Sequence, residues 1–167
     1  MTLYILRHGP AENEPPSGGD DGARRLTARG REKVRAAAAG MRALGLKFDV
    51  ILASPLPRAA ETAEVVAAVY SGGPTPEVFA PLSTGVAPAD TVGALKPYER
   101  HDHMMIVGHE PGLSGIASLL LTGSAKSVSF DFKKSGMIAL ELNNGFERGG
   151  AQLLWVLTPR QLRRLRK

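Results

Sequence analysis

Three short polar segments of this chain carry the side chains that could do chemistry, and each follows an apolar run typical of a buried β-strand. They are Arg7-His8-Gly9 after residues 3–6, residues 54–58 after residues 50–52, and Gly108-His109 after residues 104–107. Ligands of open α/β sheets bind in the crevice outside the carboxyl ends of the strands. We therefore expect the three segments to converge on one site.

Such a site would contain two guanidinium groups, from Arg7 and Arg58, and two imidazoles, from His8 and His109. The planar fork of arginine binds phosphate oxygens in pairs, so this residue set indicates a phosphoryl group as ligand. The chain has no cysteine, which excludes a thiolate nucleophile. Neighbouring guanidiniums disfavour a protonated imidazole, and a neutral imidazole is a nucleophile. We expect His8 to attack phosphorus and His109 to donate a hydrogen bond to a phosphoryl oxygen.

Amphipathic helices follow the polar segments and must hold them in place. Apolar residues recur at i, i+3, i+4 spacing in three stretches, which begin after Thr27, after Ser54-Pro55-Leu56-Pro57 and after Gly112. Thr27 is a predicted N-cap, and Pro57 suits the first turn of a helix. A shorter helical piece is expected over residues 90–95, and residues 12–22 have the glycine, proline and aspartate content of an exposed loop.

The alternation of strands and helices predicts an α/β fold, a three-layer α/β/α sandwich with a mostly parallel central sheet. Two late apolar runs, residues 137–142 and 152–157, are separated by Asn143-Asn144-Gly145 and a glycine pair. They are predicted to be a hairpin or two neighbouring strands at the end of the sheet. With no internal repeat and no linker, residues 1–167 are expected to form a single domain.

Composition narrows the class of protein. The chain has 167 residues, of which 43% are hydrophobic and 22% charged, and it contains no run of roughly 18 apolar residues. We therefore expect no membrane association and a cytoplasmic location.

The net charge is +5, but much of it comes from Arg160, Arg163, Arg164, Arg166 and Lys167. This basic end is interpreted as a solvated helix face rather than a surface for nucleic acid or an acidic protein.

The same segments resemble the histidine phosphatase superfamily, which has the phosphoglycerate mutase-like fold. The resemblance covers residues 3–109 and consists of Arg7-His8-Gly9, the sequence SPLPRAAETA at residues 54–63, and Val107-Gly108-His109. It implies that His8 accepts the phosphoryl group, that Arg7 and Arg58 bind it, and that His109 completes the pocket. It implies no metal and no cofactor. The opening RHGPA and the closing WVLTP look most like the SixA-type phosphohistidine phosphatases.

One departure from the family pattern bears on the substrate. Members that cleave alkyl phosphates have an acidic proton donor in a loop where this chain has Ser83-Thr84-Gly85. An imidazole leaves more readily than an alkoxide without a proton. The sequence therefore predicts hydrolysis of phosphohistidine on a partner protein, as in signal transduction. One alternative is a small phosphomonoester with Asp90 as the acid, and another is a non-catalytic module that binds phosphoproteins.

A second departure from the family pattern concerns mutase activity, and one histidine pair was weighed as a metal site. An asparagine seen in mutases falls one residue early here, at Asn13, with Glu14 in its place, so mutase activity is not expected. His101 and His103 have a spacing that suits one face of a strand, but no third metal ligand lies near them in the sequence. We therefore expect no metal site.

Overall fold

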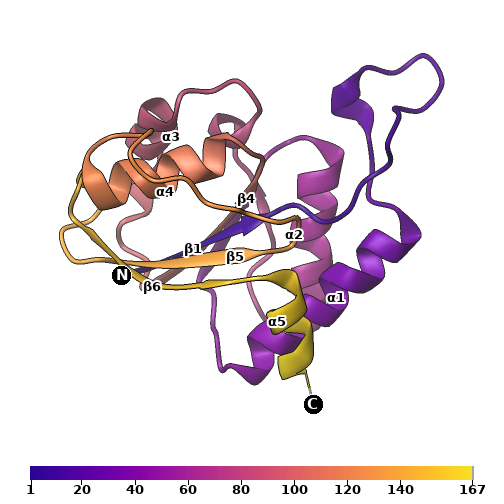
Figure 1. Ribbon diagram of the computed structural model, residues 1–167. Coiled ribbons are helices and arrows are strands. Elements are labelled where there is room, and N and C mark those ends of the chain that lie inside the picture. The colour runs from indigo at the N-terminus through magenta and orange to yellow at the C-terminus, as the bar shows by residue number, and fades with distance from the viewer. Residues whose placement is uncertain (167) are drawn as a thin grey trace.

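The computed structural model describes residues 1–166, and it contains one six-stranded sheet between two layers of helices (Figure 1). The strands are β1 (Thr2–Arg7), β2 (Val50–Ala53), β3 (Glu77–Val78), β4 (His103–Gly108), β5 (Met137–Leu142) and β6 (Ala151–Leu157). Their order across the sheet is β3-β2-β4-β1-β5-β6. The first four strands in this order are parallel, whereas β5 is antiparallel to both of its neighbours. The predicted α/β/α sandwich is confirmed, and the two late runs, predicted as a hairpin or two neighbouring strands, are the antiparallel pair β5 and β6.

Five α-helices cover the two faces of this sheet (Figure 1). On one face lie α1 (Ala28–Ala43), α2 (Pro57–Val69) and α5 (Pro159–Leu165), and on the other lie α3 (Pro88–Leu95) and α4 (Gly112–Thr122). Three short 3₁₀ helices connect them: η1 (Asp21–Ala23), η2 (Ala80–Leu82) and η3 (Lys96–Tyr98). Thr27 caps α1 as predicted, because its hydroxyl accepts the Gly30 N–H at 2.9 Å.

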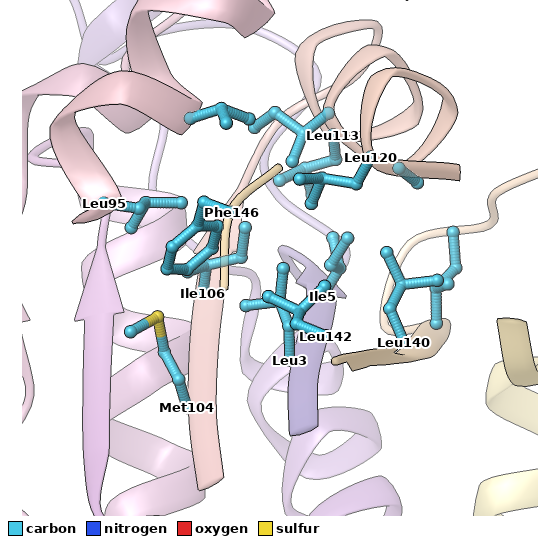
Figure 2. Close-up of a cluster of buried hydrophobic side chains, with 14 of the residues drawn as sticks. Leu3, Ile5, Leu95, Met104, Ile106, Leu113, Leu120, Leu140, Leu142 and Phe146 are labelled. Atoms are coloured by element: carbon cyan, nitrogen blue, oxygen red, sulfur yellow. The ribbon is translucent and has the colours of Figure 1, made fainter. Parts of the chain in front are cut away.

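Two hydrophobic cores form because successive side chains of a strand point to opposite faces. Leu3 and Ile5 of β1 face α3 and α4, within the cluster that Figure 2 shows. Tyr4 and Leu6 face α1 and α2 instead. Burying each of these leucine or isoleucine side chains stabilises the fold by about 1.5–3 kcal/mol. Packing on both faces fixes β1 in the middle of the sheet, and so fixes the residues that follow it.

Strand register brings the polar segments together at one edge of the sheet. Arg7 of β1 is opposite Gly108 of β4, and the His8 N–H donates to the Gly108 carbonyl at 3.1 Å. The Ser54 N–H donates to the Val107 carbonyl at 2.9 Å, which ties the end of β2 to the end of β4. The three segments that the sequence separates therefore meet at the carboxyl ends of β1, β2 and β4.

The carboxyl-terminal helix α5 packs against α1 through a close backbone approach. A side chain on Gly40 would place its Cβ 1.8 Å from the Leu162 carbonyl oxygen, so only glycine fits there. Leu162 is buried, whereas Arg160, Arg164 and Arg166 are exposed. The basic end is thus a solvated helix face up to Arg166, and Lys167 lies outside the described residues. No helix within residues 1–166 is both long and apolar enough to span a bilayer.

Candidate active site

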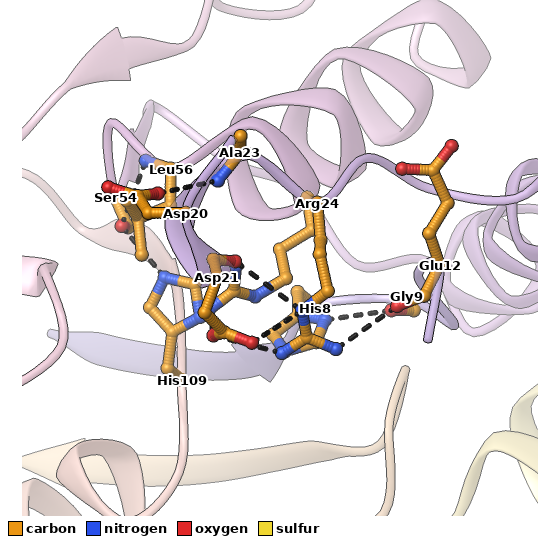
Figure 3. Close-up of polar contacts among 11 residues, drawn as sticks. His8, Gly9, Glu12, Asp20, Asp21, Ala23, Arg24, Ser54, Leu56 and His109 are labelled. Atoms are coloured by element: carbon orange, nitrogen blue, oxygen red, sulfur yellow. Dashed lines mark hydrogen bonds and ion pairs between the residues drawn. The ribbon is translucent and has the colours of Figure 1, made fainter. Parts of the chain in front are cut away.

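The two histidines predicted to act together lie side by side (Figure 3). The ring centroids of His8 and His109 are 5.1 Å apart, with the ring planes inclined at 51°. Both residues are buried, each with 6% of its surface exposed. Because one histidine follows β1 and the other follows β4, their proximity is a direct result of the strand pairing. The structure therefore brings together the histidines that the sequence predicts as partners.

The tautomer of His8 is set by its own loop. Its Nδ1 lies 2.7 Å from the Gly9 carbonyl oxygen, and a carbonyl only accepts hydrogen bonds. Nδ1 therefore carries the proton and Nε2 carries the free lone pair. The loop needs glycine at position 9, because a Cβ there would approach the Val34 Cγ2 atom to 2.4 Å. In its neutral form His8 is thus held in the tautomer that has the free lone pair on Nε2.

Ser54 holds the second histidine. The Nε2 atom of His109 lies 2.8 Å from the Ser54 hydroxyl oxygen, which also accepts the Leu56 N–H at 3.3 Å (Figure 3). Ser54 has none of its surface exposed. The Ser54 hydroxyl can donate its proton to His109 Nε2, and in that arrangement the imidazole proton is on Nδ1. The sequence placed Ser54 in the polar segment 54–58 that precedes a helix, and α2 begins at Pro57 as expected, but the contact of Ser54 with His109 was not predicted.

The two predicted arginines flank the histidines and keep donors unpaired. Arg7 donates from Nη1 to the Phe132 carbonyl, and Arg58 donates from Nη1 to the Asp21 carbonyl at 3.1 Å. The Nε atoms of both arginines and the Nδ1 atom of His109 are buried without a hydrogen-bond partner among residues 1–166. Buried donors without partners are unfavourable, so a ligand with several acceptor oxygens fits this site.

Burial and positive charge both keep the histidines neutral. Burial is the main cause that lowers the pKa of His8 from 6.5 to about 3, with further contributions from His109, Arg58 and Arg7, against the opposing hydrogen bond to Gly9. Burial, followed by the charges of Arg58, Arg7 and Arg24, lowers the pKa of His109 to about 4. At neutral pH the site therefore presents two neutral imidazoles within a positive field.

The lowered pKa values of these two histidines predict that the folded protein loses stability in acid. Unfolded histidine has a pKa near 6.5, so below this pH the unfolded chain binds protons that the folded chain does not bind until about pH 3–4. The free energy of unfolding should fall by about 2 kcal/mol per histidine between pH 7 and pH 5. Urea unfolding in a phosphate-free buffer at both pH values measures the fall. His109→Gln should lose about half of this pH dependence, and an unchanged dependence would contradict neutral burial.

A segment that the sequence left as an exposed loop lies against Arg58. The Asp21 carboxylate accepts from Arg24, with Nε at 2.8 Å, and lies 3.9 Å from Arg58 Nη2. Arg24 is also tied to the Glu12 carbonyl at 3.1 Å, which anchors both ends of the loop (Figure 3). The Arg24 hydrogen bond is the main cause that lowers the pKa of Asp21, so this carboxylate is ionised. The Asp21 carboxylate thus lies beside Arg58, the arginine that a phosphoryl group would also contact.

Removing this carboxylate should strengthen anion binding. Asp21→Asn leaves a side chain of the same size without the charge that competes for Arg58. We expect the inhibition constant of inorganic phosphate to fall by about two- to fivefold, the modest size that an exposed ion pair implies. Asp20→Asn is the matched control, because the Asp20 carboxylate only accepts the Ala23 N–H in this exposed turn. Weaker phosphate binding by Asp21→Asn would show that Asp21 positions Arg58 instead.

Two residues of α2 hold neighbouring loops in place, among them the loop after β1 that contains Gly9. The Thr62 hydroxyl accepts the Gly9 N–H at 2.9 Å and donates to the Arg58 carbonyl at 2.6 Å. Glu61 is buried and accepts from Arg25 at 2.7 Å, from Arg31 at 2.8 Å and from the Leu26 N–H at 2.9 Å. Arg58 pairs with Asp21, therefore, and not with Glu61. The sequence motif contained Thr62 and Glu61, but only the fold shows which segments they join.

An apolar cavity of about 440 Å³ opens beside His109. Its walls come from the loop after β3 and the first turns of α4, and they include Leu82, Val86, Pro88, Leu113 and Ile116. Two of its polar side chains are already satisfied, since Thr91 donates to the Pro81 carbonyl and Glu110 accepts from Ser114. The cavity therefore suits an apolar group attached to whatever the anion site binds.

The loop after β3 offers no free acid to the site. Asp90 is exposed on the first turn of α3 and does not line the cavity beside His109. Within residues 1–166, no group of three or more histidine, aspartate or glutamate side chains is arranged to hold a metal ion. His101 and His103 stack on different tyrosines, Tyr98 and Tyr4.

Comparison with known proteins agrees with this geometry. The family model described as histidine phosphatase superfamily (branch 1) matches residues 3–77. An uncharacterised protein of Picosynechococcus is 37% identical over 146 residues, which are 84% of this chain and 84% of that protein. The chain belongs to the histidine phosphatase superfamily, and it is a phosphatase of that class.

Solved structures place its fold within that superfamily. The protein histidine phosphatase SixA in complex with tungstate has a TM-score of 0.83 at 21% identity, with 97% of this chain and 99% of that chain covered. The α-ribazole phosphatase from Shigella flexneri has a TM-score of 0.73 at 21% identity, with 95% and 97% covered. The fold is therefore the phosphoglycerate mutase-like fold of the SixA structures.

Proposed function

We propose that this protein hydrolyses phosphohistidine on a partner protein through a covalent phosphohistidine intermediate on His8. The observation that carries the proposal is a neutral, buried His8 with Nε2 free, next to buried donors on Arg7, Arg58 and His109 that have no partner among residues 1–166. A phosphoryl group supplies the acceptor oxygens that these donors need. We include a cytoplasmic setting and a role in signal transduction as part of the proposal.

The first step is in-line attack by Nε2 of His8 on phosphorus. A P–N bond to the enzyme forms while the P–N bond to the substrate imidazole breaks, and that imidazole leaves with the electron pair of the broken bond. Arg7 and Arg58 stabilise the equatorial oxygens, and the Nδ1–H of His109 donates to one of them. The Gly9 carbonyl keeps the proton on Nδ1 of His8 and stabilises the positive imidazolium that phosphorylation creates.

The second step returns the enzyme to its starting state. Water attacks phosphorus on the face opposite Nε2, the enzyme P–N bond breaks, and its electron pair returns to Nε2. Inorganic phosphate leaves, and the proton lost by water goes to phosphate or solvent. Burial again favours the neutral form of His8, so the same imidazole is ready for another cycle.

The choice of phosphohistidine rests on the carboxylates around the site. Asp90 is exposed on α3, Glu110 is hydrogen-bonded to Ser114, and Asp21 is ionised beside arginines. Asp90 lies outside the cavity beside His109, the Glu110 carboxylate is engaged by Ser114, and Asp21 is engaged by arginines, so none of the three is placed free of other partners to protonate a departing alkoxide. A substrate imidazole leaves as a neutral molecule when its other nitrogen is protonated, so it needs no acid from the enzyme.

A comparison of substrates tests this assignment. The kcat/KM for a phosphorylated histidine-containing phosphotransfer protein should exceed that for glucose 6-phosphate by about 100-fold or more, the size of a typical general-acid contribution. Phosphoramidate, a small P–N compound, serves as a control for the leaving group without the protein. Equal or better hydrolysis of the sugar phosphate would contradict the proposal.

The apolar cavity favours a second candidate, a small phosphomonoester with an apolar leaving group. The cavity lies next to His109, and its volume is within the range of small-molecule sites. If this candidate is correct, 2-phenylethyl phosphate will be a far better substrate than glycerol phosphate, and Val86→Arg will remove the difference. Val78→Arg is the control, because Val78 is 72% exposed and lies outside the cavity.

A further inference from the structure

A turn in the loop before β5 is hydrogen-bonded to the end of β1, at Arg7 and His8. The Ser135 N–H donates to the carbonyls of Arg7 and His8, at 3.0 and 3.1 Å, and the Arg7 N–H donates to the Gly136 carbonyl at 3.2 Å. The turn is closed by the Gly136 N–H, which donates to the Lys133 carbonyl at 2.8 Å. Its position is therefore set by the same residues that begin the anion site.

The backbone of this turn is strained at Ser135. Its φ is 64°, and it is the one non-glycine residue with positive φ among residues 1–166. Glycine is the usual residue at this conformation, and strain of this kind is retained where the surrounding structure imposes it, often at functional sites. The Ser135 side chain is 1% exposed, so the turn has no freedom to relax into solvent.

Two adjacent lysines of this turn differ in their surroundings. The Lys133 ammonium is exposed and pairs with Asp131 at 2.6 Å. Lys134 is half-buried, and within residues 1–166 its ammonium forms no ion pair and no hydrogen bond. Burial, followed by the positive charges of Arg7, Arg24 and Arg58, lowers the pKa of Lys134.

This gathering of charge is unfavourable without an anion. Lys134 belongs to the turn that is hydrogen-bonded to Arg7 and His8, and the charges of Arg7, Arg24 and Arg58 act on its ammonium although like charges repel. Asp21 compensates part of this charge through Arg24 and Arg58, but it has no ion pair with Lys134. An oxyanion at the centre would relieve the repulsion among all four groups.

We propose that Lys134 is a third cationic ligand of the phosphoryl group, beside Arg7 and Arg58, and that the strained turn at Ser135 positions it. The ammonium donates to a phosphoryl oxygen beside those held by Arg7 and Arg58. This assignment rests on the anion site of the proposed function, but it does not depend on whether the substrate is a phosphoprotein.

Tungstate binding tests the assignment without turnover. Isothermal titration calorimetry at roughly neutral pH measures the affinity. Lys134→Met should bind tungstate about tenfold more weakly than wild type does, because one charge-assisted hydrogen bond is lost. Lys133→Met, its neighbour in the same turn, should bind within about twofold of wild type. Ser135→Gly should retain wild-type affinity, because glycine accepts the positive φ.

A pH series separates a ligand from a structural role. Wild-type affinity for tungstate should fall in the alkaline range where Lys134 loses its proton, whereas Lys134→Arg should keep its affinity there, because guanidinium stays charged. The other charged groups facing Lys134 are the guanidiniums of Arg7, Arg24 and Arg58. The pKa values of His8 and His109 are lowered to about 3 and about 4, far below the alkaline range.

The outcomes distinguish this assignment from the proposed function. Equal tungstate affinities for Lys134→Met and Lys133→Met would overturn the role of Lys134 and leave the anion site intact. A wild-type protein that does not bind tungstate would overturn both. Binding that depends on Lys134 in a protein that does not hydrolyse phosphohistidine would support Lys134 and contradict the proposed substrate.

Discussion

His8→Ala is expected to lower kcat for a phosphohistidine protein by about 10⁴-fold or more, a loss comparable with removal of a nucleophile in other covalent mechanisms. The imidazole is the group whose Nε2 is free and whose pKa is lowered to about 3, and the other buried histidine has its Nε2 engaged by Ser54. Release of inorganic phosphate from the phosphohistidine protein measures the loss. Among the described residues, no other side chain at this place in the site has a free imidazole nitrogen for the attack.

The control for this variant is His101→Ala. His101 stacks on Tyr98, away from the two site histidines, so its removal should change kcat by less than about twofold. Retention of a near wild-type rate by His8→Ala, with a normal unfolding transition, would show that His8 is not the nucleophile.

Arg58→Lys is expected to lower kcat/KM by about 10²–10³-fold although the positive charge is kept. Arg58 is 4% exposed, its Nη1 is used by the Asp21 carbonyl, and its Nε has no partner among residues 1–166. A lysine ammonium cannot bind two phosphoryl oxygens in the planar arrangement of a guanidinium, and it is more strongly hydrated. Single-turnover and steady-state kinetics on the same substrate measure the effect.

Arg42→Lys is the matched control, because Arg42 donates a single hydrogen bond, to the Val69 carbonyl on the surface. It should behave as wild type in kcat/KM. If Arg58→Lys were as active as Arg42→Lys, Arg58 would serve the loop that contains Asp21 and not the phosphoryl group.

The sheet and its order of elements followed from periodicity in the sequence. Leu3 and Ile5 alternate with Tyr4 and Leu6, and this pattern of a strand buried on both faces is what the structure shows. The late hairpin was open to two interpretations, and pairing of β5 with β6 decides it. The irregularity between Ala139 and Leu140 had no signal in the sequence, since no glycine marks it.

The site was predictable where strands position it and unpredictable where loops do. His8 and His109 follow adjacent strands, so the register alone brings them together. Asp21 and Lys134 belong to loops whose course depends on tertiary hydrogen bonds, those of Arg58 to Asp21 and of Ser135 to Arg7. The position of Asp21 beside Arg58 and the role proposed for Lys134 could not be predicted from residue types, because a surface aspartate or lysine is usually solvated.

Trapping the intermediate tests the central claim most directly. Enzyme mixed with a ³²P-labelled phosphohistidine protein is quenched in alkali within one turnover, and the labelled residue is located by mass spectrometry. The mechanism predicts an acid-labile phosphoryl group on His8, absent from His8→Ala and present in His101→Ala. A phosphoryl group on any other residue, or phosphate released without a labelled enzyme, would contradict it.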